Sequence, residues 1–185
     1  KDKVEEEGCS VPIMAKIEKW EAVQNLDEII DSFDAVMVAR GDLGVEMPIE
    51  QVPIIQKEVI KKANNSGKPV IIATQILDSM IDRSVPTRAE VSDIANAILD
   101  GADTLMVTGE TAIGKYPKKV IKVLSKVIKK TESSINYGEY SRWSSNNDIN
   151  TANAISHAAC AVSRSQRIGV LATMTHSGYT ARMAA

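Results

Sequence analysis

Ala35-Val36-Met37-Val38-Ala39-Arg40-Gly41-Asp42-Leu43-Gly44 is the stretch of the sequence that decides the fold. Its first five residues form an apolar run of strand length, and the run is continuous rather than alternating. Such a run is typical of a parallel strand that is covered on both faces. An arginine, an aspartate and two glycines follow at the carboxyl end of this predicted strand. Because ligands bind beyond the carboxyl ends of the strands in parallel α/β folds, the stretch predicts a fold class and the side of a site.

The same alternation of strand and helix recurs on both sides of this stretch. Further strands are predicted within 11–18, 69–73 and 104–107, and amphipathic helices at 21–33, 49–63, 89–99 and 118–130. Four successive β/α units of about thirty residues predict an α/β protein. The pattern leaves open whether the sheet is open and doubly wound or belongs to a (β/α)8 TIM-type barrel.

The sequence predicts two domains joined by a linker. The β/α pattern fills residues 1–132, and a polar stretch rich in serine and asparagine occupies residues 133–150. A helix at 151–163 and a strand at 168–173 are predicted after it. Residues 151–185 are therefore expected to be the truncated beginning of a separate α/β domain.

Composition excludes several classes of protein. Of the 185 residues, 44% are hydrophobic and 25% are charged, which argues against a disordered chain. The 22 basic and 24 acidic side chains nearly balance, and aromatic residues are only 4%, so no nucleic-acid partner is expected. No apolar run approaches the ~20 residues that cross a bilayer, so no membrane partner is expected either. Cys9 and Cys160 are interpreted as reduced thiols of a cytoplasmic protein.

The predicted strands of the first domain all end in polar residues that a hydrophobic core would not select. These residues are Lys16 and Glu18, Arg40 to Asp42, Thr74 and Gln75, and Thr108 to Glu110. A charged residue at one strand end is usually part of a solvated loop. Four such strand ends in succession favour one shared site at the carboxyl edge of the sheet.

Two of these strand ends carry a possible cation site. Lys16 and Glu18 are two residues apart on a strand, so both project to the same face, where they could also form a structural ion pair. Glu18 and Asp42 on neighbouring strands are the right types to bind one Mg²⁺ or Mn²⁺. Gly41-Asp42-Leu43-Gly44 is interpreted as a glycine-bracketed turn whose amides could receive a carboxylate or phosphate, although alone it is only a turn.

A further stretch, 109–115, has the spacing of a phosphate-binding P-loop, G-x-x-x-x-G-K. The next residue is Tyr116, where a P-loop needs Ser or Thr to hold Mg²⁺, and Pro117 follows it. We therefore do not interpret this stretch as a nucleotide site.

Five motifs of the first domain stand in the order and spacing of one family. They are Ala15-Lys16-Ile17-Glu18, Met37 to Glu46, Gly67 to Gln75, Pro86-Thr87-Arg88-Ala89-Glu90 and Gly109-Glu110-Thr111-Ala112, and together they resemble pyruvate kinase. The tail from Leu171 to Arg182 resembles the start of the C-terminal domain of that family. Two departures are Lys19-Trp20-Glu21-Ala22, where the family has Asn and then Glu-Gly, and Thr108, where it has Ser.

The resemblance implies phosphoryl transfer from phosphoenolpyruvate to ADP, giving pyruvate and ATP in the final step of glycolysis, with Mg²⁺ (or Mn²⁺) and K⁺. Lys16 would stabilise charge on the transferring group and the enolate, and Glu18 and Asp42 would hold the divalent ion. Gly41, Asp42 and Thr74, together with Lys16, would bind the substrate. Thr74, Thr108 and Glu110 would pass a proton to the enolate.

The resemblance also implies that this chain is only part of the enzyme. Its strands match the last four of the catalytic barrel, and the lid domain, the K⁺ ligands and the ADP-facing residues match nothing here. Catalysis by this chain alone is not expected. A homotetramer is implied, as is a sugar-phosphate effector at Thr175, Ser177, Gly178 and Thr180, although these residues could simply cap a helix.

Two other functions remain open from the residues. One is a Mg²⁺-dependent aldolase or lyase of the phosphoenolpyruvate-binding barrel type, which would also place an acidic pair around a metal. The other is a non-catalytic fragment that serves assembly.

Overall fold

The computed structural model describes residues 4, 6–8, 11–135, 151–176 and 178–184. The chain divides into two compact units, Lys1–Ile135 and Asn136–Ala185. Cys9, Ser177 and most of the predicted linker lie outside the described residues.

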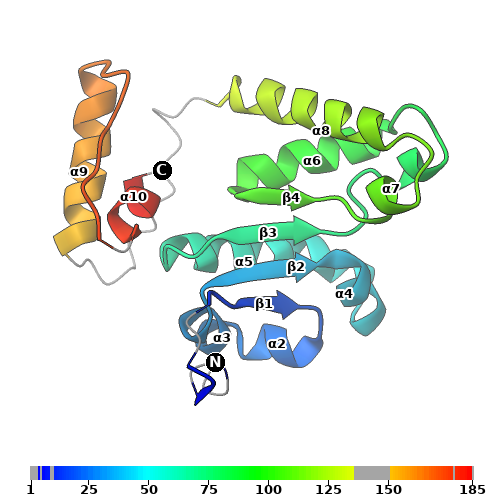
Figure 1. Cartoon of the computed structure of the whole chain (residues 1–185), viewed down its shortest axis with the longest axis horizontal. Coiled ribbons are helices and arrows are strands. Elements are labelled where there is room, and N and C mark those ends of the chain that lie inside the picture. The colour runs from blue at the N-terminus through cyan, green and yellow to red at the C-terminus, as the bar shows by residue number, and fades with distance from the viewer. Residues whose placement is uncertain (1–3, 5, 9–10, 136–150, 177, 185) are drawn as a thin grey trace. The chain divides into compact units, whose positions relative to one another are not determined.

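The first unit is built on a parallel sheet of four strands (Figure 1). The strands are β1 (Met14–Ile17), β2 (Ala35–Ala39), β3 (Val70–Ala73) and β4 (Thr104–Met106), and they lie in the order β1-β2-β3-β4. Val36 pairs with Val70, and Ile71 pairs with Thr104, so each new β/α unit adds one strand beside the previous one. This arrangement confirms the predicted α/β class and the four predicted strands of this unit.

Helices follow every strand. They are α2 (Trp20–Gln24), α3 (Leu26–Ser32), α4 (Arg40–Glu46), α5 (Val52–Asn65), α6 (Arg88–Asp100), α7 (Gly109–Ala112) and α8 (Pro117–Glu132), with 3₁₀ turns η1 (Ile49–Gln51) and η2 (Asp78–Ile81). Helix α6 starts at a capping box of Thr87 and Glu90 and ends at Gly101, whose φ of 102° lies in the left-handed region. Helix α5 packs on β2 and β3, and α6 packs on α8.

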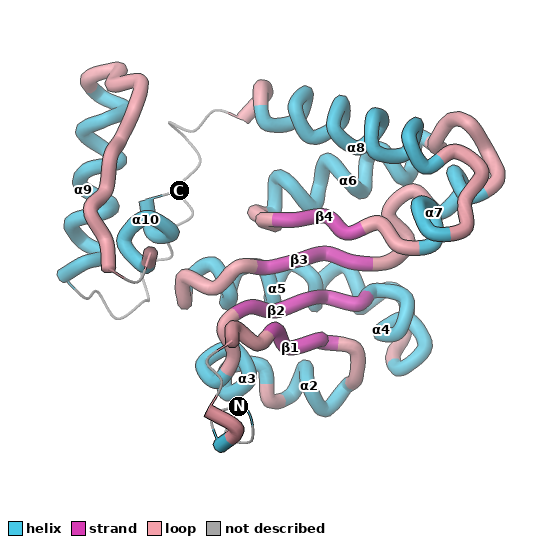
Figure 2. Tube along the Cα trace, viewed as in Figure 1, coloured by secondary structure: helices cyan, strands magenta, loops and turns pink. Residues whose placement is uncertain are grey.

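The core lies between the sheet and these helices. On β1, Ala15 and Ile17 are buried, whereas Met14 and Lys16 are exposed. Because successive strand residues point to opposite faces, Lys16 lies on the face away from the core. The segments that follow the strands gather at one edge of the sheet, where Figure 2 shows α4 and α7 beside the ends of β2 and β4.

Two local expectations in this unit were wrong. The helix predicted at 21–33 is broken into α2 and α3 at Asn25, whose side-chain amide donates to the Glu21 carbonyl at 2.8 Å. Asparagine competes in this way with the helical hydrogen bonds. The predicted turn at Gly41–Gly44 is instead part of helix α4, because Leu43 and Arg40 are buried and hold this segment against the core.

The second unit contains two described helices, α9 (Thr151–Ser165) and α10 (Tyr179–Ala184). They contact each other through Tyr179, whose hydroxyl donates to Asn153 Oδ1 at 2.8 Å, and through Cys160, whose thiol donates to the Ala184 carbonyl at 3.3 Å. The strand predicted at 168–173 does not form, since the described residues of this unit supply no neighbouring strand to pair with it.

Candidate functional site

A lysine held by two carboxylates lies at the carboxyl edge of the sheet. Lys16 Nζ pairs with the Glu18 carboxylate and donates to Asp42 Oδ2 at 2.9 Å. Lys16 lies on β1, Glu18 is the first residue after β1, and Asp42 lies in the first turn of α4. The three side chains are 48%, 34% and 52% exposed, so a ligand can reach all of them.

The contacts of this trio fix its charges. Hydrogen bonds to Glu18 and then to Asp42 raise the pKa of Lys16 above its ordinary value. The hydrogen bond from Lys16 in turn lowers the pKa of Asp42. The ammonium and the Asp42 carboxylate therefore stay charged over a wider pH range than isolated side chains would.

Gly41 and Thr74 join the ends of β2 and β3. The Gly41 N–H donates to Thr74 Oγ1 at 2.8 Å, and the Thr74 hydroxyl donates to the Ala73 carbonyl at 2.7 Å. A Cβ at position 41 would lie 3.3 Å from Thr74 Oγ1, a tighter approach than ordinary van der Waals contact. Glycine at position 41 therefore lets this amide and this hydroxyl meet.

The turn after β3 has an unusual backbone. Thr74 has a φ of 65° and Gln75 a φ of 53°, and both are left-handed conformations at residues other than glycine. Each costs about 1–3 kcal/mol and persists only where the surroundings hold it. Such a turn at the predicted site must be held by specific contacts.

One anchor of this turn is Glu110. Its side chain is fully buried, with 1% of the residue exposed. One carboxylate oxygen accepts the Leu77 N–H at 3.0 Å, and the other accepts the Thr108 N–H at 2.8 Å. These contacts tie the start of α7 to the loop after β3.

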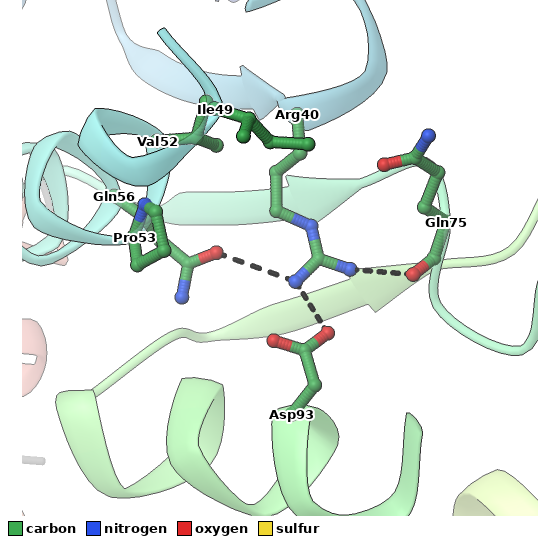
Figure 3. Close-up of a pocket in the computed structure, with 7 residues that line it drawn as sticks. All are labelled: Arg40, Ile49, Val52, Pro53, Gln56, Gln75 and Asp93. Carbon is green, nitrogen blue, oxygen red and sulfur yellow. Dashed lines mark hydrogen bonds and ion pairs between the residues drawn. The ribbon is translucent and has the colours of Figure 1, made fainter. Parts of the chain in front are cut away.

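A second anchor is Arg40, which the sequence placed at a strand end without a role. Its residue is 8% exposed, and its guanidinium donates to the Thr74 carbonyl at 3.0 Å and to the Gln75 carbonyl at 2.8 Å. It also pairs with Asp93 of α6 and lies 3.5 Å from the Gln56 side-chain oxygen of α5 (Figure 3). The partners Gln56 and Asp93 were missed because a single polar residue on an amphipathic helix is normally solvated.

The predicted residues thus form three contact groups: Lys16 with Glu18 and Asp42, Gly41 with Thr74, and Thr108 with Glu110. Neighbouring positions 41 and 42 link the first group to the second. The Thr74–Leu77 loop links the second to the third. The contacts of Thr108 and Glu110 are directed to this loop rather than to Lys16.

The structure also describes the P-loop-like stretch and part of the predicted effector segment. Lys115 of the P-loop-like stretch pairs with Asp82 at 2.7 Å, and its N–H donates to the Ile81 carbonyl at 2.8 Å. In the predicted effector segment, Thr175 Oγ1 accepts the Gly178 N–H at 3.0 Å, and Thr180 lies in the first turn of α10. The effector role stays a prediction.

Residues 1–121 match the family described as pyruvate kinase, barrel domain. The chain belongs to the pyruvate kinase family. It is 51% identical over 181 residues to a pyruvate kinase of Thermotoga maritima, covering 98% of this chain and 38% of that relative. It is 60% identical over 121 residues to a pyruvate kinase of Mycobacterium tuberculosis, covering 65% of this chain and 26% of that one. This chain therefore spans less than two fifths of the length of either pyruvate kinase.

A solved structure supports the same assignment. A crystal structure of a pyruvate kinase from Cryptosporidium parvum superposes with a TM-score of 0.87 at 41% identity, covering 95% of this chain and 36% of that one. The four-stranded sheet is thus part of a pyruvate kinase barrel, which confirms the predicted partial barrel and decides against the open, doubly wound sheet. In the part of the chain that the structure describes, no helix combines the length and apolarity needed to cross a bilayer.

Proposed function

We propose that this chain provides part of the active site of an enzyme that transfers a phosphoryl group from phosphoenolpyruvate to ADP, giving pyruvate and ATP. The observation that carries the proposal is the exposed Lys16 held between Glu18 and Asp42 at the carboxyl ends of β1 and β2. Active sites of β/α barrels lie at this end of the strands. The names of the relatives support the same reaction.

Lys16 neutralises the charge of the transferring group and of the enolate. Phosphoryl transfer depends mainly on positioning and on electrostatic stabilisation, so a preorganised ammonium is the group that this step needs. The two carboxylates hold Lys16 protonated and fix the place of its Nζ.

The residues fit a divalent ion. Two carboxylates already gather around one cation, the ammonium of Lys16. Among the described residues no group of three or more His, Cys, Asp and Glu gathers as a metal site, but Mg²⁺ commonly uses only one or two carboxylates with substrate oxygens and water. Glu18 and Asp42 would hold Mg²⁺ or Mn²⁺, and the ion when bound would polarise substrate oxygens and neutralise their charge. The K⁺ ligands are assigned to no residue of this chain.

The pair formed by Gly41 and Thr74 fits the substrate carboxylate. The Gly41 N–H now donates to Thr74 Oγ1, and the Thr74 hydroxyl donates to the Ala73 carbonyl. On binding, both would turn to the substrate carboxylate, together with the Asp42 N–H. The enolate would then be protonated through water and the hydroxyls of Thr74 and Thr108. Glu110 is buried and both of its oxygens accept backbone N–H groups, so we propose that it serves this path by orienting Thr108 and the loop after β3.

We place the reaction in the cytoplasm, in a homotetramer that responds to a phosphorylated sugar. Cys160 is a free thiol, which suits a reducing compartment. The assembly and the effector rest on the family resemblance, with Thr175, Ser177, Gly178 and Thr180 as the effector residues.

The proposal is tested in a full-length protein that contains this chain. ATP formation from phosphoenolpyruvate and ADP is measured for the unmodified protein, for Glu18→Gln and Asp42→Asn, and for the control Asp27→Asn. Asp27 is an exposed carboxylate that pairs with Lys62 away from the site. ATP formation that both site variants greatly reduce and the control leaves intact is expected. A protein that makes no ATP but cleaves or condenses a pyruvate enolate would instead be the aldolase or lyase. If Glu18→Gln leaves divalent-ion binding unchanged, the non-catalytic assembly function is favoured.

A further inference from the structure

We propose that Arg40 is a positioning residue, which together with Asp93 holds the Thr74–Gln75 turn so that the Thr74 hydroxyl meets the Gly41 amide. The inference rests on the proposed function, in which Thr74 and Gly41 contact the substrate. The described contacts of the Arg40 guanidinium are with Thr74, Gln75, Gln56 and Asp93, and none is with Lys16 or the carboxylates of the trio. Its effect on the reaction would pass through the turn.

The guanidinium joins three successive β/α units at one point. Arg40 is the first residue of α4, directly after β2, and the two carbonyls that it binds follow β3. Its two side-chain partners, Gln56 and Asp93, stand on α5 and α6 (Figure 3). Arginine presents five N–H donors in a rigid planar fork. Its Nε and Nη2 both donate to the Thr74 carbonyl, and Nη2 also reaches the Gln75 carbonyl. One side chain thus binds both carbonyls of the left-handed pair.

Asp93 makes this arrangement possible. A buried guanidinium is stable only when it is paired and hydrogen-bonded. The Asp93 carboxylate supplies the counter-charge on Nη1, and the Gln56 oxygen lies near the same nitrogen. Since Nη1 is directed to the two helices, Nε and Nη2 remain free to face the turn.

Lysine could not replace the arginine here. An ammonium is a compact charge without the planar fork, so it cannot reach Asp93 and both carbonyls with the same geometry. A cavity of about 230 Å³ borders the guanidinium, lined by Arg40, Gln75 and Asp93 among others. Water could enter the space left by a shorter or thinner side chain and solvate the carbonyls of the turn. The turn would then lose the contact that compensates its left-handed backbone.

The chain offers a matched control. Lys57 of α5 and Asp100 of α6 form a second ion pair between these two helices. This pair does not contact the Thr74–Gln75 turn. The variants are therefore Arg40→Lys and Asp93→Asn, with Lys57→Gln as the control, all in a full-length protein that contains this chain. Circular dichroism first establishes that each variant is folded.

The first measurement does not depend on activity. Amide hydrogen exchange of Gly41 reports the bond from its N–H to Thr74 Oγ1. We expect exchange at Gly41 to be at least tenfold faster in Arg40→Lys, faster by a smaller factor in Asp93→Asn, and within twofold in Lys57→Gln. Unchanged exchange in both site variants would overturn the proposal. If Arg40→Lys fails to fold, Asp93→Asn alone decides by the same criterion.

The second measurement is kinetic. A misplacement of about 1 Å can cost about 10²-fold in rate, so we expect kcat/KM for phosphoenolpyruvate to fall by about 10–100-fold in Arg40→Lys. KM for ADP should stay within twofold, which a general structural defect would not produce. The double variant Arg40→Lys/Thr74→Val should have the same kcat/KM as Thr74→Val alone, because Arg40 acts only through Thr74. If the losses of kcat/KM in the two single variants multiply in the double variant, action through Thr74 is contradicted. If the unmodified protein forms no ATP, only the proposed function is refuted, because the exchange experiment still tests Arg40.

Discussion

Two charged clusters lie at the same edge of the sheet and differ mainly in burial. The trio of Lys16, Glu18 and Asp42 is between one third and one half exposed, while Arg40 and Glu110 are almost completely buried. The exposed charges contact one another. The buried ones bind backbone groups of the loop after β3, apart from the pairing of Arg40 with the side chains of Asp93 and Gln56.

This difference in burial predicts different roles for the two clusters. An exposed ion pair contributes little to stability, so the trio is free to exchange its partners for a ligand. A buried charge has a large desolvation cost and must keep its partners, so Arg40 and Glu110 fix geometry. Substitutions in the trio should therefore change activity, whereas substitutions at the buried anchors should also change the free energy of unfolding.

The largest effect is expected for Lys16→Met in a full-length protein that contains this chain. Loss of a preorganised electrostatic contact should lower kcat by about 10²–10³-fold. The KM for phosphoenolpyruvate should change much less, and the unfolding midpoint should barely move because the ion pairs of Lys16 are exposed. Steady-state kinetics and urea unfolding measure both, with Lys118→Met on the exposed side of α8 as the control. Near-normal turnover would refute the assigned role.

Glu110→Gln tests the buried side of the comparison. The carboxylate accepts two backbone N–H groups, and glutamine would direct an NH₂ group at one of these donors. Hydrogen bonds to a buried charged group contribute about 1.5–3 kcal/mol, so the free energy of unfolding should fall by about 2–3 kcal/mol. Urea unfolding measures this change, and Glu50→Gln at an exposed position should leave it unchanged. A stable Glu110→Gln protein would mean that the buried carboxylate does not anchor the loop.

Gly41→Ala should separate geometry from stability. The new methyl group would lie 3.3 Å from Thr74 Oγ1, so the hydroxyl must move by a few tenths of an ångström. We expect about a tenfold loss in kcat/KM for phosphoenolpyruvate from this misplacement. Stability should hold, because alanine is the better helix former within α4.

The control for that variant is Gly44→Ala in the same helix. An added Cβ there meets nothing within 4 Å. It should raise the free energy of unfolding by about 0.5–1 kcal/mol and leave kcat/KM unchanged. Equal activity losses in the two variants would show that the site senses helix α4 as a whole and not the Thr74 contact.

The sequence predicted the sheet and the trio because both follow from local patterns. Strand β2 is a continuous apolar run, and its predicted bounds agree with the structure. Lys16 and Glu18 share a face because strand side chains repeat every two residues. Positions 41 and 42 follow directly from the end of that strand. These features need no knowledge of distant contacts.

The buried anchors could not be predicted because they depend on distant contacts. Arg40 and Asp93 are 53 residues apart, and nothing near either residue shows that they pair. The left-handed backbone at Thr74 and Gln75 carries no glycine or asparagine to reveal it. Helix α4 was missed for a related reason, since its two glycines disfavour a helix and the burial of Leu43 outweighs them.

The smallest effect is expected at a carboxylate of intermediate burial, Glu90. Burial raises its pKa, but hydrogen bonds from Ser79 and Thr87 outweigh burial and hold the pKa of Glu90 below its ordinary value. Ser79 donates through its N–H at 2.7 Å and its hydroxyl at 2.6 Å, and the Thr87 N–H donates at 2.7 Å. Because the folded-state pKa is lowered, Glu90 contributes stability above its unfolded-state pKa of about 4.3, and this contribution is lost as the pH falls through the folded-state value.

Glu90→Gln should therefore lower the free energy of unfolding by about 1 kcal/mol near neutral pH, as loss of a helix cap does. The difference from the unmodified protein should vanish only once the pH has fallen below the lowered folded-state pKa of Glu90, because the carboxyl group is then protonated in both states. Urea unfolding between pH 7 and pH 3 measures it, and Asp31→Asn at an exposed position of α3 serves as the control. A difference as large as that of Glu110→Gln would mean that the number of hydrogen bonds on a carboxylate, rather than its burial, decides how strongly it anchors this edge of the sheet.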